Sequence, residues 1–78
     1  MPLNVVNTGW LPIAVQIIDT LCNVTIYQGN IVGNAQVATR ACFDRNGRMD
    51  LILIDLSRRR SYRFTGSSPT INLRIRES

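Results

Sequence analysis

Apolar residues in this chain fall in short alternating runs separated by turn-forming residues, and this pattern constrains the fold more than any other feature. Seven such runs are visible, at residues 3–7, 12–19, 23–28, 35–43, 48–56, 61–65 and 70–76. Alternation with a period of two is typical of half-buried strands, and turn signals about every 8–12 residues are typical of small sandwiches and barrels. We therefore expect an all-β fold, a small antiparallel β-sandwich of about seven strands with immunoglobulin-like character, built from residues 1–78 as a single β domain.

The second run also fits one face of a helix with Pro12 in its first turn. The apolar residues on that face would be Ile13, Ala14, Ile17, Ile18 and Leu21. Most residues from 13 to 18 are β-branched, however, and this favours a strand. A short helix at 13–21 would instead accompany a five-stranded Sm- or SH3-like barrel, which is the alternative fold.

Turn chemistry predicts two reversals of the chain. Residues 44–47 read Asp-Arg-Asn-Gly, which combines an acceptor side chain with a glycine suited to positive φ, so we expect a turn between the fourth and fifth runs. Residues 29–34 contain Gly29 and Gly33 and predict a looser hairpin loop between the third and fourth runs.

The two cysteines become cross-strand neighbours if this looser loop is symmetric. That register places Gln28 opposite Gln36 and Cys22 opposite Cys42, which is close enough for a disulfide. Closing a loop of about 20 residues would stabilise the fold by roughly 3 kcal/mol in the chain-entropy model. Two buried free thiols remain the alternative, because the sequence carries no export signal and reducing compartments keep thiols reduced.

The fifth run holds more apolar residues than one core face needs. Residues 51–54 are apolar at every position, and Ile18 repeats this excess in the second run. Only one face of each sheet in a small sandwich meets the core, and an uncovered apolar stripe promotes aggregation. We therefore predict a homo-oligomer, in its simplest form a dimer, with Ile18, Ile52 and Ile54 in the interface.

Histidine and lysine are absent, and this limits the chemistry available to the chain. The nine cations are all arginines and the net charge is +4. Without histidine or lysine no Ser–His or Cys–His pair can form, and two cysteines with scattered carboxylates make a poor metal set. We expect no catalytic residue, no metal and no cofactor, and hence no enzymatic activity.

Arginines cluster near the sixth run and suggest an anionic partner. The arginines could contact the phosphates of RNA or single-stranded DNA, and nearby aromatic rings could stack on the bases. The arginines are Arg58, Arg59, Arg60 and Arg63, with Tyr62 and Phe64 as the aromatic residues.

Two stretches of the chain show partial likenesses. Residues 24–56, with a Gly-rich bend, Phe43-Asp44 and an apolar run after Met49, are similar to the first motif of Sm-like RNA-binding rings. Residues 37–64, with Asp44, Asn46-Gly47 and a later Tyr-x-Phe, are similar to prealbumin-like and immunoglobulin-like bacterial modules. Each likeness covers less than half of the chain, so neither assigns it to a family.

The function that these observations favour is a non-enzymatic β-sandwich protein that acts as a binding or assembly module through self-association and protein contacts. Binding of RNA or single-stranded DNA through the arginine-rich loop is the alternative.

Trp10, between Gly9 and Leu11, is predicted to plug one end of the sandwich. No basic leader and no apolar run near the roughly 18 residues of a membrane span are visible. The cytoplasm is therefore the default compartment, and no membrane partner is expected.

Overall fold

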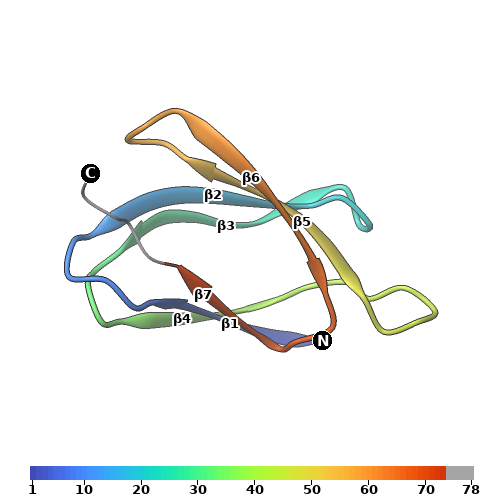
Figure 1. Cartoon of the computed structure of the whole chain (residues 1–78). Coiled ribbons are helices and arrows are strands. Elements are labelled where there is room, and N and C mark those ends of the chain that lie inside the picture. The colour runs from blue at the N-terminus through green and yellow to red at the C-terminus, as the bar shows by residue number, and fades with distance from the viewer. Residues whose placement is uncertain (74–78) are drawn as a thin grey trace.

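The computed structural model describes residues 1–73, and over this range the chain forms seven strands and no helix (Figure 1). They are β1 (Pro2–Asn7), β2 (Ile13–Asp19), β3 (Val24–Ile31), β4 (Gln36–Arg40), β5 (Met49–Asp55), β6 (Arg60–Gly66) and β7 (Thr70–Leu73). A three-stranded sheet in the order β4-β1-β7 faces a four-stranded sheet in the order β3-β2-β5-β6. The all-β prediction is confirmed. The seventh run was predicted to reach residue 76, and its last three positions lie outside the described residues.

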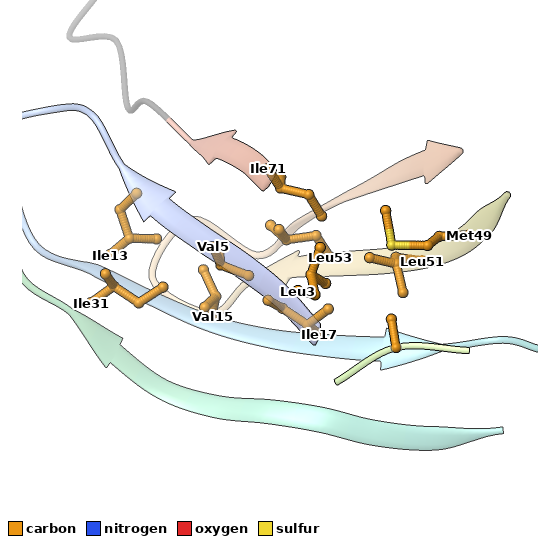
Figure 2. Packing of buried hydrophobic residues seen from close by; sticks show 11 residues of the cluster. Leu3, Val5, Ile13, Val15, Ile17, Ile31, Met49, Leu51, Leu53 and Ile71 are labelled. Atoms are coloured by element: carbon orange, nitrogen blue, oxygen red, sulfur yellow. The ribbon is translucent and has the colours of Figure 1, made fainter. Parts of the chain in front are cut away.

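The alternation in the sequence becomes an inner and an outer face in the two central strands. β2 and β5 alternate strictly between buried and half-buried positions. Their buried apolar residues are Ile13, Val15 and Ile17 on β2 and Met49, Leu51 and Leu53 on β5. Leu3 and Val5 of β1 meet these side chains from the other sheet, as Figure 2 shows. The described residues thus share one core between the sheets, and the outer faces remain for other contacts.

One pair of strands departs from the predicted antiparallel arrangement. β1 and β7 run parallel, with Val5 beside Ile71, whereas the other pairs are antiparallel. The chain leaves the four-stranded sheet at Gly66, crosses to the other sheet and then runs in the direction of β1. The prediction of a wholly antiparallel sandwich is therefore wrong for this pair. Alternation specifies the face that a residue takes and says nothing of the direction of the next strand.

The predicted hairpin between β3 and β4 is also wrong. Gln28 pairs with Gln16 of β2, whereas Gln36 pairs with β1 in the other sheet. The loop after β3 carries the chain between the sheets and binds the β1–β2 loop, where the Asn34 N–H donates to the Gly9 carbonyl at 3.1 Å. A contact with a loop distant in the sequence therefore overrides the local symmetry that predicted the hairpin.

The turn predicted at residues 44–47 is present. The Gly47 N–H donates to the Asp44 carbonyl at 3.0 Å, and Asp44 Oδ1 accepts from the N–H groups of Asn46 at 2.8 Å and Arg48 at 3.0 Å. The strands on either side nevertheless belong to different sheets. The turn residues specify a reversal of the chain, and tertiary packing decides which strands pair.

The alternative fold is excluded, because residues 13–19 form a strand and seven strands lie in two sheets. The helix at 13–21 and the five-stranded barrel are therefore both wrong. In immunoglobulin constant domains the first two strands are neighbours in one sheet, whereas β1 and β2 here lie in different sheets. The immunoglobulin-like part of the prediction is thus not confirmed, and the established class is a two-sheet all-β fold.

Candidate interaction surfaces

Asn7, at the end of β1, is a fully buried polar residue that joins the two sheets. Its Nδ2 donates to the carbonyls of Leu11 at 2.7 Å and Ile31 at 3.1 Å, and its Oδ1 accepts from the Gly9 N–H at 3.0 Å. The Ile31 contact reaches β3 in the opposite sheet, and the other two fix the β1–β2 loop. Asn7 therefore positions the loop that carries Trp10.

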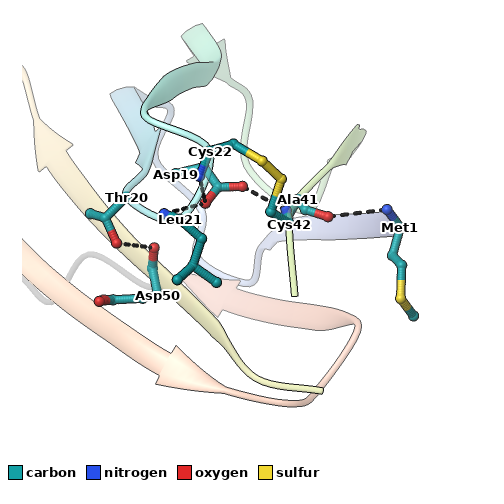
Figure 3. The surroundings of a disulfide bond; sticks show 8 residues. All are labelled: Met1, Asp19, Thr20, Leu21, Cys22, Ala41, Cys42 and Asp50. Atoms are coloured by element: carbon teal, nitrogen blue, oxygen red, sulfur yellow. Dashed lines mark hydrogen bonds between the residues drawn. A yellow bond between two sulfur atoms is a disulfide. The ribbon is translucent and has the colours of Figure 1, made fainter. Parts of the chain in front are cut away.

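At the opposite end of the molecule, Asp19 and a disulfide bond lie side by side and link the loops there (Figure 3). Asp19 Oδ1 accepts from the N–H groups of Leu21 at 3.0 Å and Cys22 at 3.3 Å, and its Oδ2 accepts from the Cys42 N–H at 2.6 Å. Cys22 is bonded to Cys42, with their Cα atoms 6.0 Å apart. Cys22 lies in the β2–β3 turn and Cys42 follows β4, so the disulfide links the two sheets rather than two strands of one hairpin.

Asp19, Cys22 and Cys42 bring potential metal-ligand atoms within 4.8 Å of one another. In the oxidised protein the sulfur atoms of Cys22 and Cys42 are bonded to each other and offer no thiolate. Asp19 already accepts three backbone hydrogen bonds. With the disulfide intact, this cluster is therefore a structural link between the sheets.

The residues predicted for the oligomer interface lie together on the outer face of the four-stranded sheet. Ile18 and Ile52 are register partners on β2 and β5, Ile54 follows on β5, and all three are half-buried. Gln16 lies beside Ile54, and Arg63 lies beside Ile52. The stripe therefore has a polar border, which sequence reasoning missed because neighbouring strands supply it.

Arg63 forms one part of this border through an ion pair with Asp50. Its Nε and Nη2 donate to the two carboxylate oxygens at 2.9 and 2.6 Å. The hydrogen bond from Arg63 lowers the pKa of Asp50 below its ordinary value, and the same bond raises the pKa of Arg63. The predicted arginine cluster is therefore divided, because Arg63 lies on the outer face and is paired there.

The other three arginines of the predicted cluster lie exposed at the end of the β5–β6 hairpin. Asp55, only 5% exposed, shapes this turn. Its carboxylate accepts from the N–H groups of Ser57 at 3.0 Å and Arg58 at 3.1 Å, and its carbonyl accepts from the Arg59 N–H at 2.8 Å. Arg59 closes the turn with a φ of 57°. The hairpin therefore presents Arg58, Arg59 and Arg60 on a defined backbone.

The inner face of β6 is incompletely covered, because the facing sheet has one strand fewer. Tyr62 on this face is 53% exposed, and Phe64 is half-buried. Together with Leu53, Ile71 and Leu73 they line a groove of about 420 Å³ between β6 and β7, to which Arg58 and Arg60 also contribute. The aromatic residues predicted to stack on bases thus line a groove that combines apolar side chains with arginines.

Trp10 does not plug the sandwich, so that prediction is wrong. Its side chain is 88% exposed on the β1–β2 loop. The backbone of Trp10 packs so closely on the β3–β4 loop that a Cβ at Gly33 would overlap the Trp10 carbonyl oxygen. The loops meet through their backbones, and the indole remains outside. The flanking Gly9 and Pro12 are the sequence signal for this loop, which the plug hypothesis underweighted.

The fold and its surfaces define a small two-sheet all-β protein. Comparison of the chain with protein-family models, with curated proteins and with solved structures gives no match. Within residues 1–73, no helix is long and apolar enough to cross a membrane. The functional argument therefore depends on the surfaces themselves.

Proposed function

We propose that this protein is a non-enzymatic binding or assembly module that associates with a second copy of itself through the outer face of its four-stranded sheet. The observation that carries the proposal is the continuous stripe formed by Ile18, Ile52 and Ile54 on two adjacent strands. Each isoleucine is half-buried within the single chain. A second copy would remove the remaining apolar surface from water, which is the usual driving force of association.

The geometry of the stripe suits a symmetric contact. A two-fold axis brings the same patch from both copies together, so the stripes would face each other. Gln16 and Arg63 on the flanking positions would then form the polar rim that interfaces usually have. The absence of histidine and lysine from the sequence supports a function that needs no general base.

The test is sedimentation of the purified protein at micromolar concentration. The wild type should sediment as a dimer or a larger closed assembly, and Ile52→Lys/Ile54→Lys should sediment as a folded monomer. Val24→Lys/Val32→Lys is the matched control, because both valines are exposed, at 50% and 62%, and lie outside the stripe. A monomeric wild type, or a folded isoleucine variant of unchanged mass, would refute the proposal.

Nucleic-acid binding is the second candidate, and the specific observation that favours it is the exposed run from Arg58 to Arg60 on one turn. A generic oligonucleotide titrated at increasing salt tests it. Binding tighter than about 10 µM at physiological salt, weakening steeply as salt rises, would favour this function. No binding, or binding insensitive to salt, would exclude it.

The link between Cys22 and Cys42 also bears on the compartment. Disulfides persist mainly in oxidising compartments, which is at odds with the cytoplasmic default expected from the sequence. Thiol titration of protein isolated from its source under alkylating conditions would establish which state is native. Two alkylated thiols would restore the cytoplasmic expectation.

A further inference from the structure

Three loops meet at one end of the sandwich, which we call the Trp10 end: residues 8–12, 32–35 and 56–59. Ile13, the first residue of β2, pairs with Ile31, the last residue of β3, so the loop before β2 and the loop after β3 lie side by side. Val15 pairs with Asp55 on the other side of β2, which brings the β5–β6 turn to the same end. Figure 1 shows the three connections at the end of the molecule opposite the β4–β5 turn.

These loops expose apolar side chains that the core does not use. Trp10 is 88% exposed, Val32 62%, and Leu11 and Leu56 are each 41% exposed. They come from three different loops, and none of them lines the groove between β6 and β7. Large apolar residues gathered on exposed loops indicate a contact surface.

The backbone beneath these side chains is fixed. Asn7 binds Leu11 and Gly9, and the Asn34 N–H binds the Gly9 carbonyl. The Leu56 N–H donates to the Ala14 carbonyl at 2.9 Å, which ties the third loop to β2. The exposed residues are therefore presented in a defined arrangement before any partner binds, and a prearranged surface loses less entropy on binding.

The charge of this end is positive among the described residues. The β5–β6 turn contributes Arg58, Arg59 and Arg60, all exposed. Within residues 1–73, the acidic residue of this turn is Asp55, which is 5% exposed and accepts hydrogen bonds from the N–H groups of Ser57 and Arg58. A partner approaching the Trp10 end would thus meet cations together with apolar side chains.

We propose that the Trp10 end docks on an anionic lipid surface, with Trp10, Leu11, Val32 and Leu56 entering the interfacial layer and Arg59 and Arg60 contacting anionic headgroups. Tryptophan with aliphatic residues and arginines is the combination that membrane interfaces favour, and each arginine near an anionic surface adds to the attraction. From the sequence we expected no membrane partner, because no apolar run is long enough to span a bilayer. Docking at the surface of a bilayer needs no such run. The exposure of Trp10, which the sequence did not predict, is what supports surface docking.

A lipid surface fits these loops better than the other macromolecules. Protein partners usually need a continuous patch with a buried centre, whereas these four side chains come from three separate loops. Nucleic acid would use the arginines and the indole, but the three aliphatic side chains would gain nothing from base stacking. The proposal is independent of self-association through the isoleucine stripe, which lies on a sheet face rather than at this end.

The sequence supplies its own reporter, because Trp10 is the only tryptophan. The full chain is mixed with vesicles of phosphatidylcholine containing phosphatidylglycerol, and with vesicles of phosphatidylcholine alone. With the anionic vesicles we expect a blue shift of the indole emission, quenching by brominated acyl chains, and co-sedimentation of the protein. With the neutral vesicles binding should be much weaker.

Variants assign the effect to this end. Arg59→Gln/Arg60→Gln should bind the anionic vesicles about 30-fold more weakly, whereas Arg45→Gln/Arg48→Gln, which removes the same charge from the exposed β4–β5 turn, should change affinity much less. Trp10→Ser should lose co-sedimentation, and Leu21→Ser, at a residue 45% exposed near the disulfide, should keep it.

Three outcomes would overturn the proposal. The first is an unchanged indole emission with no co-sedimentation. The second is equal loss of affinity in the two double-arginine variants, which would indicate net charge rather than this end. The third is an oligonucleotide that binds through Arg59 and Arg60 while anionic vesicles do not, which would support the second candidate function instead.

Discussion

At each end of the sandwich a buried polar side chain joins a loop to the opposite sheet, and the two ends use different groups. At the Trp10 end Asn7 faces two carbonyls and one N–H group. At the disulfide end, formed by the β2–β3 turn and the segment after β4, Asp19 faces three N–H groups. An amide can donate and accept, whereas a carboxylate can only accept. The backbone groups around each site therefore explain which residue stands there.

The ends also differ in what holds them and what they expose. The disulfide end has a covalent link between the sheets in addition to Asp19. Among residues 1–73, hydrogen bonds and backbone packing hold the Trp10 end, and Trp10 is the most exposed of the large apolar residues described. A rigid scaffold with contact residues on its loops is a common arrangement in binding proteins. The difference suggests that one end stabilises the fold and the other end binds.

The largest expected effect is that of Asn7→Asp at the Trp10 end. The new carboxylate would be buried against the carbonyls of Leu11 and Ile31 with one N–H donor, and an uncompensated buried charge costs about 3–5 kcal/mol. Urea unfolding at neutral pH measures this loss. Burial would raise the pKa of the new carboxyl above its unfolded value, so stability should partly return as the pH falls below the folded pKa.

Asn4→Asp is the control, because Asn4 lies exposed on the same strand. It should change the free energy of unfolding by less than about 0.5 kcal/mol. Equal losses in the two variants would show that Asn7 does not act as a buried donor.

At the disulfide end, reduction should have the next largest effect. Breaking the Cys22–Cys42 bond, which closes a segment with a sequence separation of 20, should remove roughly 3 kcal/mol in the chain-entropy model and lower the Tm by about 10 °C or more. Thermal unfolding with and without a reductant measures this change. The intact protein should contain no titratable thiol, and thiols that react only after denaturation would instead show two buried free cysteines.

The cysteines illustrate how far sequence reasoning reached. A symmetric β3–β4 hairpin placed Cys22 opposite Cys42, and the structure bonds the two residues although that hairpin does not exist. Cys22 lies in a turn and Cys42 follows a strand of the other sheet. Proximity was predicted through a register that is wrong, because local symmetry cannot detect a loop that crosses between sheets.

The alternation of apolar residues predicted which face of a strand each side chain takes. The turn residues predicted less well which strands pair with one another. It placed Leu51 and Leu53 on one face of β5 and Ile52 and Ile54 on the other, as the structure does. Which strands lie beside β5 depends on contacts between distant residues, such as Asn34 with Gly9. The exposure of Trp10 was missed for the same reason, since its loop packs by its backbone against Gly33 of a loop distant in the sequence, and Trp10 itself is 88% exposed.

Asp19→Asn tests the acceptor role at the disulfide end. An amide at this position retains one oxygen acceptor and points its NH₂ group at a backbone N–H, so at least one buried donor loses its partner, at a cost of about 1–3 kcal/mol. Urea unfolding measures it. Asp44→Asn is the control, because Asp44 also accepts two backbone hydrogen bonds but is exposed to water. A loss no larger than in the control would contradict the buried role of Asp19.

Substitution of one glycine at each end should destabilise the fold, by a steric clash at Gly33 and by an unfavourable φ at Gly47. Gly33→Ala places a Cβ against the Trp10 carbonyl, so the loops must separate, at about 1–3 kcal/mol with a changed indole emission. Gly47→Ala has no atom within 4 Å of its Cβ but keeps a φ of 73°, which disfavours alanine by about 1 kcal/mol. Chemical unfolding followed by circular dichroism and by fluorescence separates them. An altered Trp10 spectrum in the Gly47 variant would show that the two ends are coupled.

The smallest effect is expected at Asp50, whose backbone carbonyl accepts from Thr20 at the disulfide end. Arg63 lowers the pKa of Asp50 in the folded protein, so the pair stabilises the fold above the unfolded pKa of about 3.9 and loses this contribution as the pH falls through the folded value. Because the Arg63 side chain is 70% exposed, salt should weaken the pair. Asp50→Asn should therefore be slightly less stable than the wild type at pH 7 in low salt, and the difference should vanish in strong acid or high salt.

Arg63→Gln should reproduce the loss, and the double variant should add little to it. A difference that persists in acid would show that Asp50 acts through packing rather than charge.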